Sequence, residues 1–100
     1  DHIGSFHEGL ARASKGGKWF HIRHDGTPAY EQRYDNVEPF HEGLAQAHND
    51  GKRFHIHPNG VPAYKQRYDD VGSFEGGLGR VRKGGQEFQI RPDGTRVEVN

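Results

Sequence analysis

The sequence predicts an all-β protein assembled from three tandem copies of one unit. Phe-His-Glu-Gly-Leu-Ala occupies residues 6–11 and again 40–45, and a degenerate form, Phe-Glu-Gly-Gly-Leu-Gly, occupies 74–79. The copies are 34 residues apart, and a fixed period of this length is typical of repeat architectures. Each copy also contains two tight-turn signals flanked by alternating apolar and polar residues, which favours β-hairpins over helices.

The composition indicates a folded chain without an electrostatic preference for nucleic acid or membrane. Hydrophobic residues make up 30% of the 100 residues, and 14 basic residues balance 14 acidic ones. Disordered chains usually combine low hydrophobicity with high net charge and few aromatic residues, whereas 11% of this chain is aromatic. A neutral balance argues against nucleic acid and anionic membranes as partners.

The residue types and segments that the chain lacks limit the cellular contexts that we expect for it. No apolar run approaches the roughly 20 residues of a transmembrane helix, and we expect no signal peptide within these residues. The chain contains no cysteine, so neither a disulfide framework nor a thiolate metal site is expected. It contains no methionine either, so we do not expect Asp1 to be a translation start. We expect a soluble processed product or a segment of a longer protein, with an extracytoplasmic location left open.

The three copies align as residues 1–34, 35–68 and 69–100 of a single repeat domain. The first two agree at twenty of the 34 positions, whereas the third lacks their His and Ala-Tyr positions. Terminal repeats are often atypical because one face meets water instead of a neighbour. We therefore expect the degenerate third copy to cap the array.

Each copy is expected to form a three-stranded meander with two hairpin turns. Asp-Gly, Asn-Gly and Gly-Gly suit two-residue type I′ turns, which need positive φ at both central positions. Proline cannot donate to a ladder, so a third strand that opens at Thr27-Pro28 or Val61-Pro62 should be short or lie at an edge. The predicted turns are at 16–17, 50–51 and 84–85, and at 25–26, 59–60 and 93–94.

The two turns predict a side-chain register. In the first copy, a loop at 16–17 places Ala13 opposite Phe20, and a loop at 25–26 places Ile22 opposite Ala29. Apolar pairs then fall on one face and polar residues on the other. The polar face carries Arg12, His21 and Tyr30 in the first copy, Gln46, His55 and Tyr64 in the second, and Arg80, Gln89 and Glu98 in the third.

Longer segments, 31–43 and 65–77, connect one meander to the next. We expect Phe40 and Phe74 to fill the gaps between units. A single meander cannot bury its own apolar face, so stacking of neighbours must supply the core. The pattern is compatible with an open array or solenoid and, alternatively, with a closed pseudo-threefold or propeller-like arrangement.

The residues shared between the copies form one extended pattern. In the first copy it comprises Phe6, Glu8, Gly9, Leu10, Ala11, Gly17, Lys18, Trp19, Ile22, Gly26, Tyr34 and Asp35. In the second copy it comprises Phe40, Glu42, Gly43, Leu44, Ala45, Gly51, Lys52, Ile56, Gly60, Tyr68 and Asp69. This pattern resembles the WG-repeat family of bacterial proteins, and the resemblance covers nearly the whole chain.

The chain departs from that family at the Trp-Gly pair for which it is named. The corresponding residues are Trp19-Phe20, Arg53-Phe54 and Glu87-Phe88, and Phe-His-Ile replaces Gly-Tyr-Ile at 20–22 and 54–56. The chain is therefore expected to be a variant branch. The resemblance implies a β repeat array that serves as a binding or structural module, without a common enzymatic activity.

Eight histidines raise the question of a transition-metal site. Neutral imidazoles suit zinc, copper or nickel, and stacked repeats could bring His21 near His55. His57 lies two residues after His55 and would share its face of a strand. The alternative is that His21 and His55 are outer-face residues that pack beside tyrosines. Because Gln89 replaces them in the third copy, no metal or other cofactor is expected.

No catalytic constellation stands out, so we do not expect an enzyme. His7-Glu8 and His41-Glu42 are half of a zincin signature, but alanine stands at the second ligand position. We expect both glutamates to accept backbone N–H bonds in the turn before the following strand. Tyr34 and Tyr68 are expected in the core, each with a preceding arginine that bridges to an aspartate.

The sequence therefore predicts a non-catalytic repeat module that binds a protein or glycan through its polar outer face, because aromatic faces beside arginine can bind sugars and peptides. One alternative is head-to-tail assembly of copies of the chain into a filament or extracellular fibre, since its two ends are nearly in phase. Another is a metal-binding module built on His21, His55 and His57. The candidate partner-binding residues are Arg12, Trp19, His21, Arg23, Tyr30, Gln46, His55, His57 and Tyr64.

Overall fold

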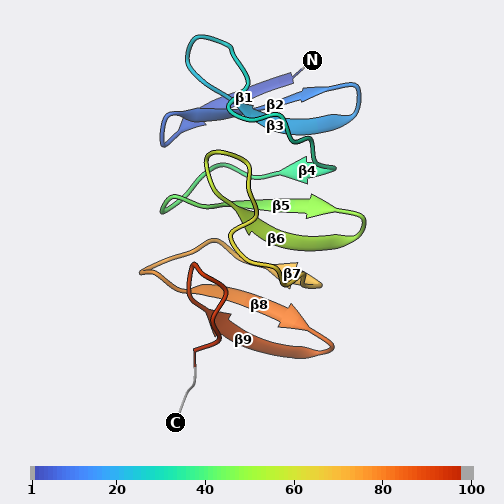
Figure 1. The fold of residues 1–100 in the computed structure, drawn as a ribbon, viewed down its shortest axis with the longest axis vertical. Coiled ribbons are helices and arrows are strands. Elements are labelled where there is room, and N and C mark those ends of the chain that lie inside the picture. Colours follow the sequence, from blue (N-terminus) through green and yellow to red (C-terminus); the bar gives the residue numbers. More distant parts are fainter. Residues whose placement is uncertain (1, 98–100) are drawn as a thin grey trace.

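The computed structural model describes residues 2–97, and within that range the regular structure is entirely β. The strands form three separate antiparallel sheets, each with three strands in chain order (Figure 1). This confirms the all-β fold with three tandem three-stranded sheets. The sheets comprise β1 (His2–His7), β2 (Leu10–Lys15) and β3 (Lys18–Ile22); β4 (Asn36–Val37), β5 (Ala45–Asn49) and β6 (Lys52–Ile56); and β7 (Asp70–Val71), β8 (Gly79–Lys83) and β9 (Gln86–Ile90).

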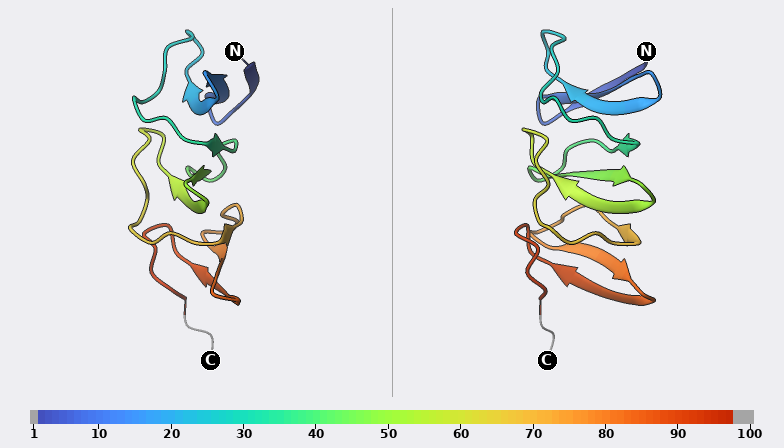
Figure 2. Two further views of the ribbon diagram at one scale, coloured as in Figure 1. Left: turned by 90° about the vertical axis from the view of Figure 1, so that its right-hand side faces the viewer. Right: turned by 45° about the vertical axis from the view of Figure 1, so that its right-hand side comes forward.

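The three sheets lie in a row along the longest dimension of the molecule, which extends over 47 × 26 × 19 Å. The first and the last described residues lie at opposite ends of this row in Figure 1 and in both turned views of Figure 2. The main contacts between sheets join β3 to β4 and β6 to β7, so each repeat packs against the next one along the chain. Within residues 2–97, no helix has the length and apolar character needed to cross a membrane.

The first hairpin turn of each copy has the predicted register. Gly16 and Gly17 have φ angles of 62° and 81°, as a type I′ turn requires. Ala13 consequently pairs with Phe20, and apolar residues of β2 and β3 share one face. The equivalent pairs in the other two sheets are Ala47–Phe54 and Val81–Phe88.

The second turn is one residue longer than predicted. Two backbone hydrogen bonds of 2.9 Å close a loop over residues 24–26, with Gly26 at a φ of 85°. This is the three-residue loop in which a left-handed glycine follows a type I turn. The extra loop residue shifts the pairing, so that Ile22 bridges to Pro28 and not to Ala29.

The third strand of each sheet also differs from the prediction. The residues after the second turn form only isolated bridges, at Pro28, Pro62 and Arg96. Proline lacks the N–H that a longer ladder would need in the first two copies. The strand that completes each sheet instead precedes the first hairpin: it is β1, β4 or β7. Glu98, which the predicted register placed on the polar face, lies outside the described residues.

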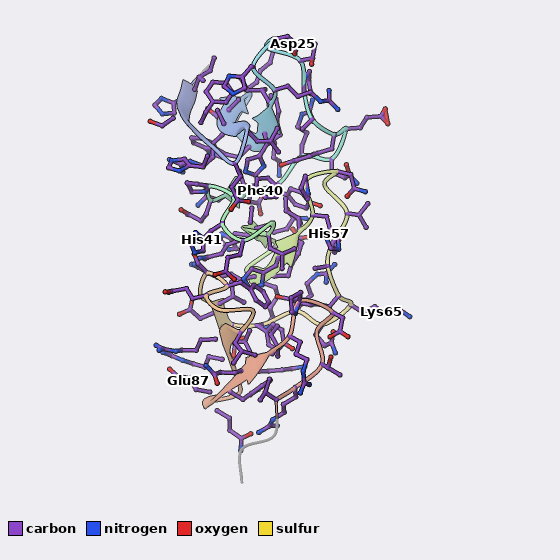
Figure 3. All side chains as sticks on the ribbon, turned by 90° about the vertical axis from the view of Figure 1, so that its left-hand side faces the viewer. Asp25, Phe40, His41, His57, Lys65 and Glu87 are labelled. Atoms are coloured by element: carbon purple, nitrogen blue, oxygen red, sulfur yellow. The ribbon has the colours of Figure 1, made fainter. Side chains whose placement is uncertain are left out.

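Phe40 and Phe74 fill the gaps between repeats, as expected. Their exposed fractions are 3% and 1%, and Figure 3 shows Phe40 between the first and second repeats. Both belong to a continuous core, because neighbouring repeats cover faces that a lone meander would expose to water. This core comprises Ala11, Ala13, Phe20, Ile22, Tyr30, Tyr34, Val37, Phe40, Leu44, Ala45, Ala47, Phe54, Ile56, Tyr64, Tyr68, Val71, Phe74, Val81 and Ile90.

Candidate functional site

The polar face that was expected to bind a partner is largely buried. Four of its residues are at most 7% exposed: His21, Tyr30, His55 and Tyr64. The prediction that these side chains lie on the outer surface is therefore wrong. The physical reason is that the next repeat covers this face, where the Phe40 ring packs on the His21 ring with centroids 4.4 Å apart.

Each buried histidine links a tyrosine of its own repeat to the backbone that leads into the next one. In the first copy, His21 Nδ1 lies 2.5 Å from the Tyr30 hydroxyl, and Nε2 lies 3.0 Å from the Glu38 carbonyl oxygen. A carbonyl only accepts, so Nε2 carries the proton and Nδ1 accepts from the tyrosine. The second copy repeats the arrangement, at 2.6 and 2.7 Å, with His55, Tyr64 and the Gly72 carbonyl.

Burial keeps both histidines neutral. It lowers the pKa of His21 and of His55 to about 4 from the ordinary 6.5, although the hydrogen bond from each ring to a carbonyl acts in the opposite direction. Burial also raises the pKa of Tyr30 and of Tyr64 above the usual 10. Since both ring nitrogens of each histidine are engaged, neither imidazole presents a free ligand.

The histidines suggested as metal ligands do not share a face. Strand β6 ends at Ile56, so His57 lies in the following loop (Figure 3) and is exposed. His55 is buried, with an exposed fraction of 1%. Between residues 2 and 97, no group of three or more His, Cys, Asp or Glu side chains is placed to hold a metal ion. The geometry therefore does not favour the metal-binding alternative.

Arg12 and Trp19 remain partly accessible on the first repeat. The Arg12 guanidinium lies 5.4 Å from the centre of the Trp19 ring, a cation–π arrangement, and it donates to the Val37 carbonyl at 3.5 Å. The Trp19 ring also meets the His2 ring at an angle of 64°, with centroids 5.8 Å apart. These side chains form an aromatic and basic cluster on the first repeat.

The other candidate residues are held within the protein or lie in a loop. Arg23 donates to two backbone carbonyls of its own repeat, at 2.9 and 3.3 Å. The Gln46 amide reaches the third repeat, where in its favoured orientation it bonds the Val71 carbonyl and the Ser73 N–H at 3.2 Å each. His57 stays available to solvent. Gln46 is thus a residue that joins repeats.

Glu8 and Glu42 also join neighbouring repeats. The Glu8 carboxylate accepts the backbone N–H groups of Glu42 and Gly43 at 2.7 and 2.8 Å. Glu42 does the same for Gly76 and Gly77, at 2.8 and 3.0 Å, and these bonds lower the pKa of Glu42. The expected acceptor role is confirmed, but the turn belongs to the next repeat. The 34-residue recurrence of the glutamate was the sequence signal for this contact.

Tyr34 and Asp35 form another link between the first and second repeats. The Tyr34 ring packs edge-on against Phe54, with centroids 5.7 Å apart, and its hydroxyl donates to the Gly60 carbonyl at 2.6 Å. The Asp35 carboxylate pairs with Lys18 at 2.5 Å and accepts a backbone N–H of the second repeat at 2.9 Å. The bond to Lys18, followed by the backbone bond, lowers the pKa of Asp35.

Arg33 and Arg67, which precede Tyr34 and Tyr68, were expected to bridge to aspartates, but they make other contacts. The Arg33 guanidinium lies 3.9 Å from the centre of the Phe20 ring and donates to three backbone carbonyls, those of residues 30–32, at 2.9 to 3.0 Å. Arg67 lies 4.0 Å from the centre of the Phe54 ring. Each arginine therefore packs on an aromatic ring of its own repeat instead of pairing with a carboxylate.

The first repeat presents part of the inter-repeat joint to solvent: Ile3 and Gly26 are exposed, whereas Phe20 and Ile22 lie beneath them in the core and are 8% and 7% exposed. A hollow of about 420 Å³ is lined by Phe20 and Gly26, the equivalents of Phe54 and Gly60, and also by Ile3 and Ile22. Ile3 is 63% exposed and Phe6 is 39% exposed. We call this surface, formed by Ile3, Phe6, Phe20, Ile22 and Gly26, the first-repeat end face.

Comparison with known proteins agrees with this repeat organisation. A family profile described as WG containing repeat matches residues 1–19, 22–52 and 56–86, which together make up about four fifths of the chain. The second and third matched segments begin 34 residues apart, the same period as the hexapeptide. No curated protein and no solved structure is significantly similar to the chain.

Proposed function

Because the chain belongs to the WG-containing repeat family, we propose that it is a non-catalytic repeat module that binds another polypeptide through the first-repeat end face. One observation carries this proposal. Ile3 and Phe6 are 63% and 39% exposed, whereas their equivalents Val37 and Phe40 are 1% and 3% exposed because they lie between repeats. Exposed apolar side chains that are contiguous mark interaction surfaces more often than scattered ones do.

The joints inside the molecule support a polypeptide rather than a glycan as the occupant. At the joint between the first two repeats, the covering groups are the ring and hydroxyl of Tyr34 and the carboxylate of Glu8, which meet an aromatic ring and backbone carbonyl and N–H groups of the second repeat. The end face offers the same kind of surface: an aromatic ring, aliphatic side chains and the backbone of a glycine turn. A polypeptide can supply both the rings and the hydrogen bonds that such a surface requires.

The assignment as a non-catalytic module is supported by how the polar side chains are used. The buried histidines hold neighbouring tyrosines and carbonyls, and Glu8 and Glu42 hold backbone amides of the next repeat. A general base must be within reach of a substrate proton. The lone pairs of these four side chains are instead committed to contacts that keep the repeats together.

Selection of peptides from a random phage-displayed library tests the proposal. Peptides selected on the whole chain should lose binding to the Phe6→Asp variant, because a carboxylate in the apolar end face would remain poorly solvated in the complex. Val61→Asp is the matched control, since Val61 is a 45% exposed apolar residue of the second repeat. Peptides that bind Phe6→Asp as well as the parent chain would refute the end face as the site, as would binding confined to a glycan array.

A further inference from the structure

The turn at Gly60 shows what covers the equivalent turn of the first repeat. Gly60 is buried, and a Cβ atom built on it would lie 2.4 Å from Tyr30 Cγ and 2.7 Å from Gln32 Oε1. Such distances leave no room for any side chain at this position. The glycine is therefore required both for its φ of 83° and for the close approach of the preceding repeat.

The equivalent turn of the third repeat is covered in the same way, whereas the equivalent turn of the first repeat is uncovered. A Cβ atom built on Gly94 would lie 2.5 Å from Tyr64 Cβ and 3.1 Å from Gln66 Oε1. A Cβ atom built on Gly26 would meet no atom within 4 Å. Gly26 has a φ of 85°, close to that of the two covered glycines, so the loop already has the conformation seen under a neighbour.

The hollow beside Gly26 matches the site that Tyr34 fills in the second repeat. There, the Tyr34 ring packs against Phe54 and its hydroxyl donates to the Gly60 carbonyl at 2.6 Å. The hollow on the first repeat is lined by the equivalent residues, Phe20 and Gly26. A tyrosine placed there could pack edge-on against Phe20 and donate to the Gly26 carbonyl.

We propose that the first-repeat end face is a receptor for a Tyr-X-Gln-X-Tyr segment carried by another repeat of this family. The first tyrosine and the glutamine would cover Gly26, as Tyr30 and Gln32 cover Gly60. The second tyrosine would fill the hollow, as Tyr34 does in the second repeat. This inference rests on the proposed function, because it names the partner of the same surface.

The two intervening positions are outside the recognition contact. The residue after the first tyrosine is Glu31 in one internal segment and Lys65 in the other, and both are exposed. Figure 3 shows Lys65 pointing away from the stack. The fourth position is an arginine in both segments, but Arg33 packs on Phe20 of its own repeat. The receptor therefore selects the two tyrosines and the glutamine.

A hexapeptide with the sequence of residues 29–34, acetylated and amidated, is a direct probe. Added to the ¹⁵N-labelled whole chain, it should shift the amide signals of Phe20, Ile22 and Gly26, and leave those of Ile90 and Gly94 in place. The peptide in which both tyrosines are alanine should cause no shifts. The Tyr34→Phe peptide should bind about fivefold more weakly, because it lacks one hydroxyl donor.

A chain variant tests the receptor side of the contact. Gly26→Asn introduces a Cβ atom where the first tyrosine would lie, and asparagine tolerates positive φ better than most residues. Its spectrum should match that of the parent chain outside the loop, while the peptide no longer binds. Peptide binding to Gly26→Asn with unchanged affinity would overturn the inference.

Covalent attachment compensates for the weak affinity of a free hexapeptide, because the linked segment has a high effective concentration. The chain extended by these six residues before Asp1 should melt at a higher temperature than the same extension with both tyrosines replaced by alanine. Equal melting temperatures together with no shifts from the free peptide would refute the inference. If peptides selected from the library still depended on Phe6, the proposed function would stand without it.

Discussion

The hexapeptide Phe-His-Glu-Gly-Leu-Ala adopts two structures in one chain. At residues 6–11 it ends β1 and begins β2, and Phe6 is 39% exposed. At 40–45 the ladder before the turn is reduced to an isolated bridge, and Phe40 is 3% exposed. The turn itself is the same, since Glu8 and Glu42 have φ angles of 52° and 51°.

The difference between the two copies comes from what lies beside them. Phe40 packs against the buried His21 of the preceding repeat, with centroids 4.4 Å apart. Phe6 stacks on His24 of its own loop instead, with centroids 4.0 Å apart and an interplanar angle of 8°. An identical local sequence thus specifies an identical turn, whereas the neighbouring repeat decides where the aromatic ring goes.

Truncating the two phenylalanines should give the largest difference between the copies. Phe40→Ala should lower the free energy of unfolding by about 3–5 kcal/mol, because it leaves a cavity between two repeats. Phe6→Ala should cost less than about 1 kcal/mol, because solvent already reaches that ring. Urea denaturation of both variants measures the difference. Equal losses would show that the end copy is packed as tightly as the interior one.

Lowering the pH is a second way to distinguish the joints between repeats from the first-repeat end face. The pKa of His21 and of His55 is about 4 in the folded chain and 6.5 ordinarily, so the unfolded chain binds more protons between these values. The stabilisation is complete above pH 6.5 and is lost as the pH falls toward 4. His55→Gln should remove on the order of 3 kcal/mol of the stability loss between pH 7 and 4.

Urea titrations of the parent chain and of His55→Gln at several pH values would measure that change. His41→Gln is the control, because His41 is exposed and belongs to the hexapeptide itself. If His41→Gln reduced the pH dependence of stability as much as His55→Gln does, burial of the histidine would not be its cause.

Replacing the turn glycines by alanine should also distinguish the covered turn from the uncovered one. Gly60→Ala and Gly26→Ala impose similar backbone strain, since their φ angles are 83° and 85°. Only the methyl group at Gly60 would collide with Tyr30. Gly60→Ala should therefore lower the unfolding free energy by about 1–3 kcal/mol more than Gly26→Ala, as expected of overpacking. Thermal melts of the pair check this, and a smaller loss at Gly60 would be inconsistent with the close approach.

Neutralising the glutamates should have the smallest effect. Glu42→Gln weakens the acceptor for Gly76 and Gly77 and should lower the melting temperature by less than Phe40→Ala does. Glu75→Gln is the control, because Glu75 lies exposed in the last repeat and occupies the position of His41 rather than that of Glu42. High salt should narrow the gap between these two variants, since exposed charges are screened. A larger fall for Glu75→Gln would argue against Glu42 as a link between repeats.

Much of the architecture could be predicted from short-range chemistry. The period, the type I′ turns and the pairing of Ala13 with Phe20 depend on glycine conformation and on alternation along a strand, which are properties of a few neighbouring residues. The second turn was predicted one residue too short, because Asp-Gly also ends three-residue loops. That error shifted the partner of Ile22 from Ala29 to Pro28.

Alternation along each strand set which side chains share a face, whereas the packing of one repeat on the next set which of these faces meet water. Polar alternation placed His21 and Tyr30 together, but it could not show that Phe40 would cover them. A histidine can be buried at low cost when it is neutral and both ring nitrogens are hydrogen-bonded, so polarity alone did not predict its exposure. The reach of Glu8 to a turn 34 residues away was likewise decided by stacking. Strand geometry is local, whereas burial depends on the neighbour.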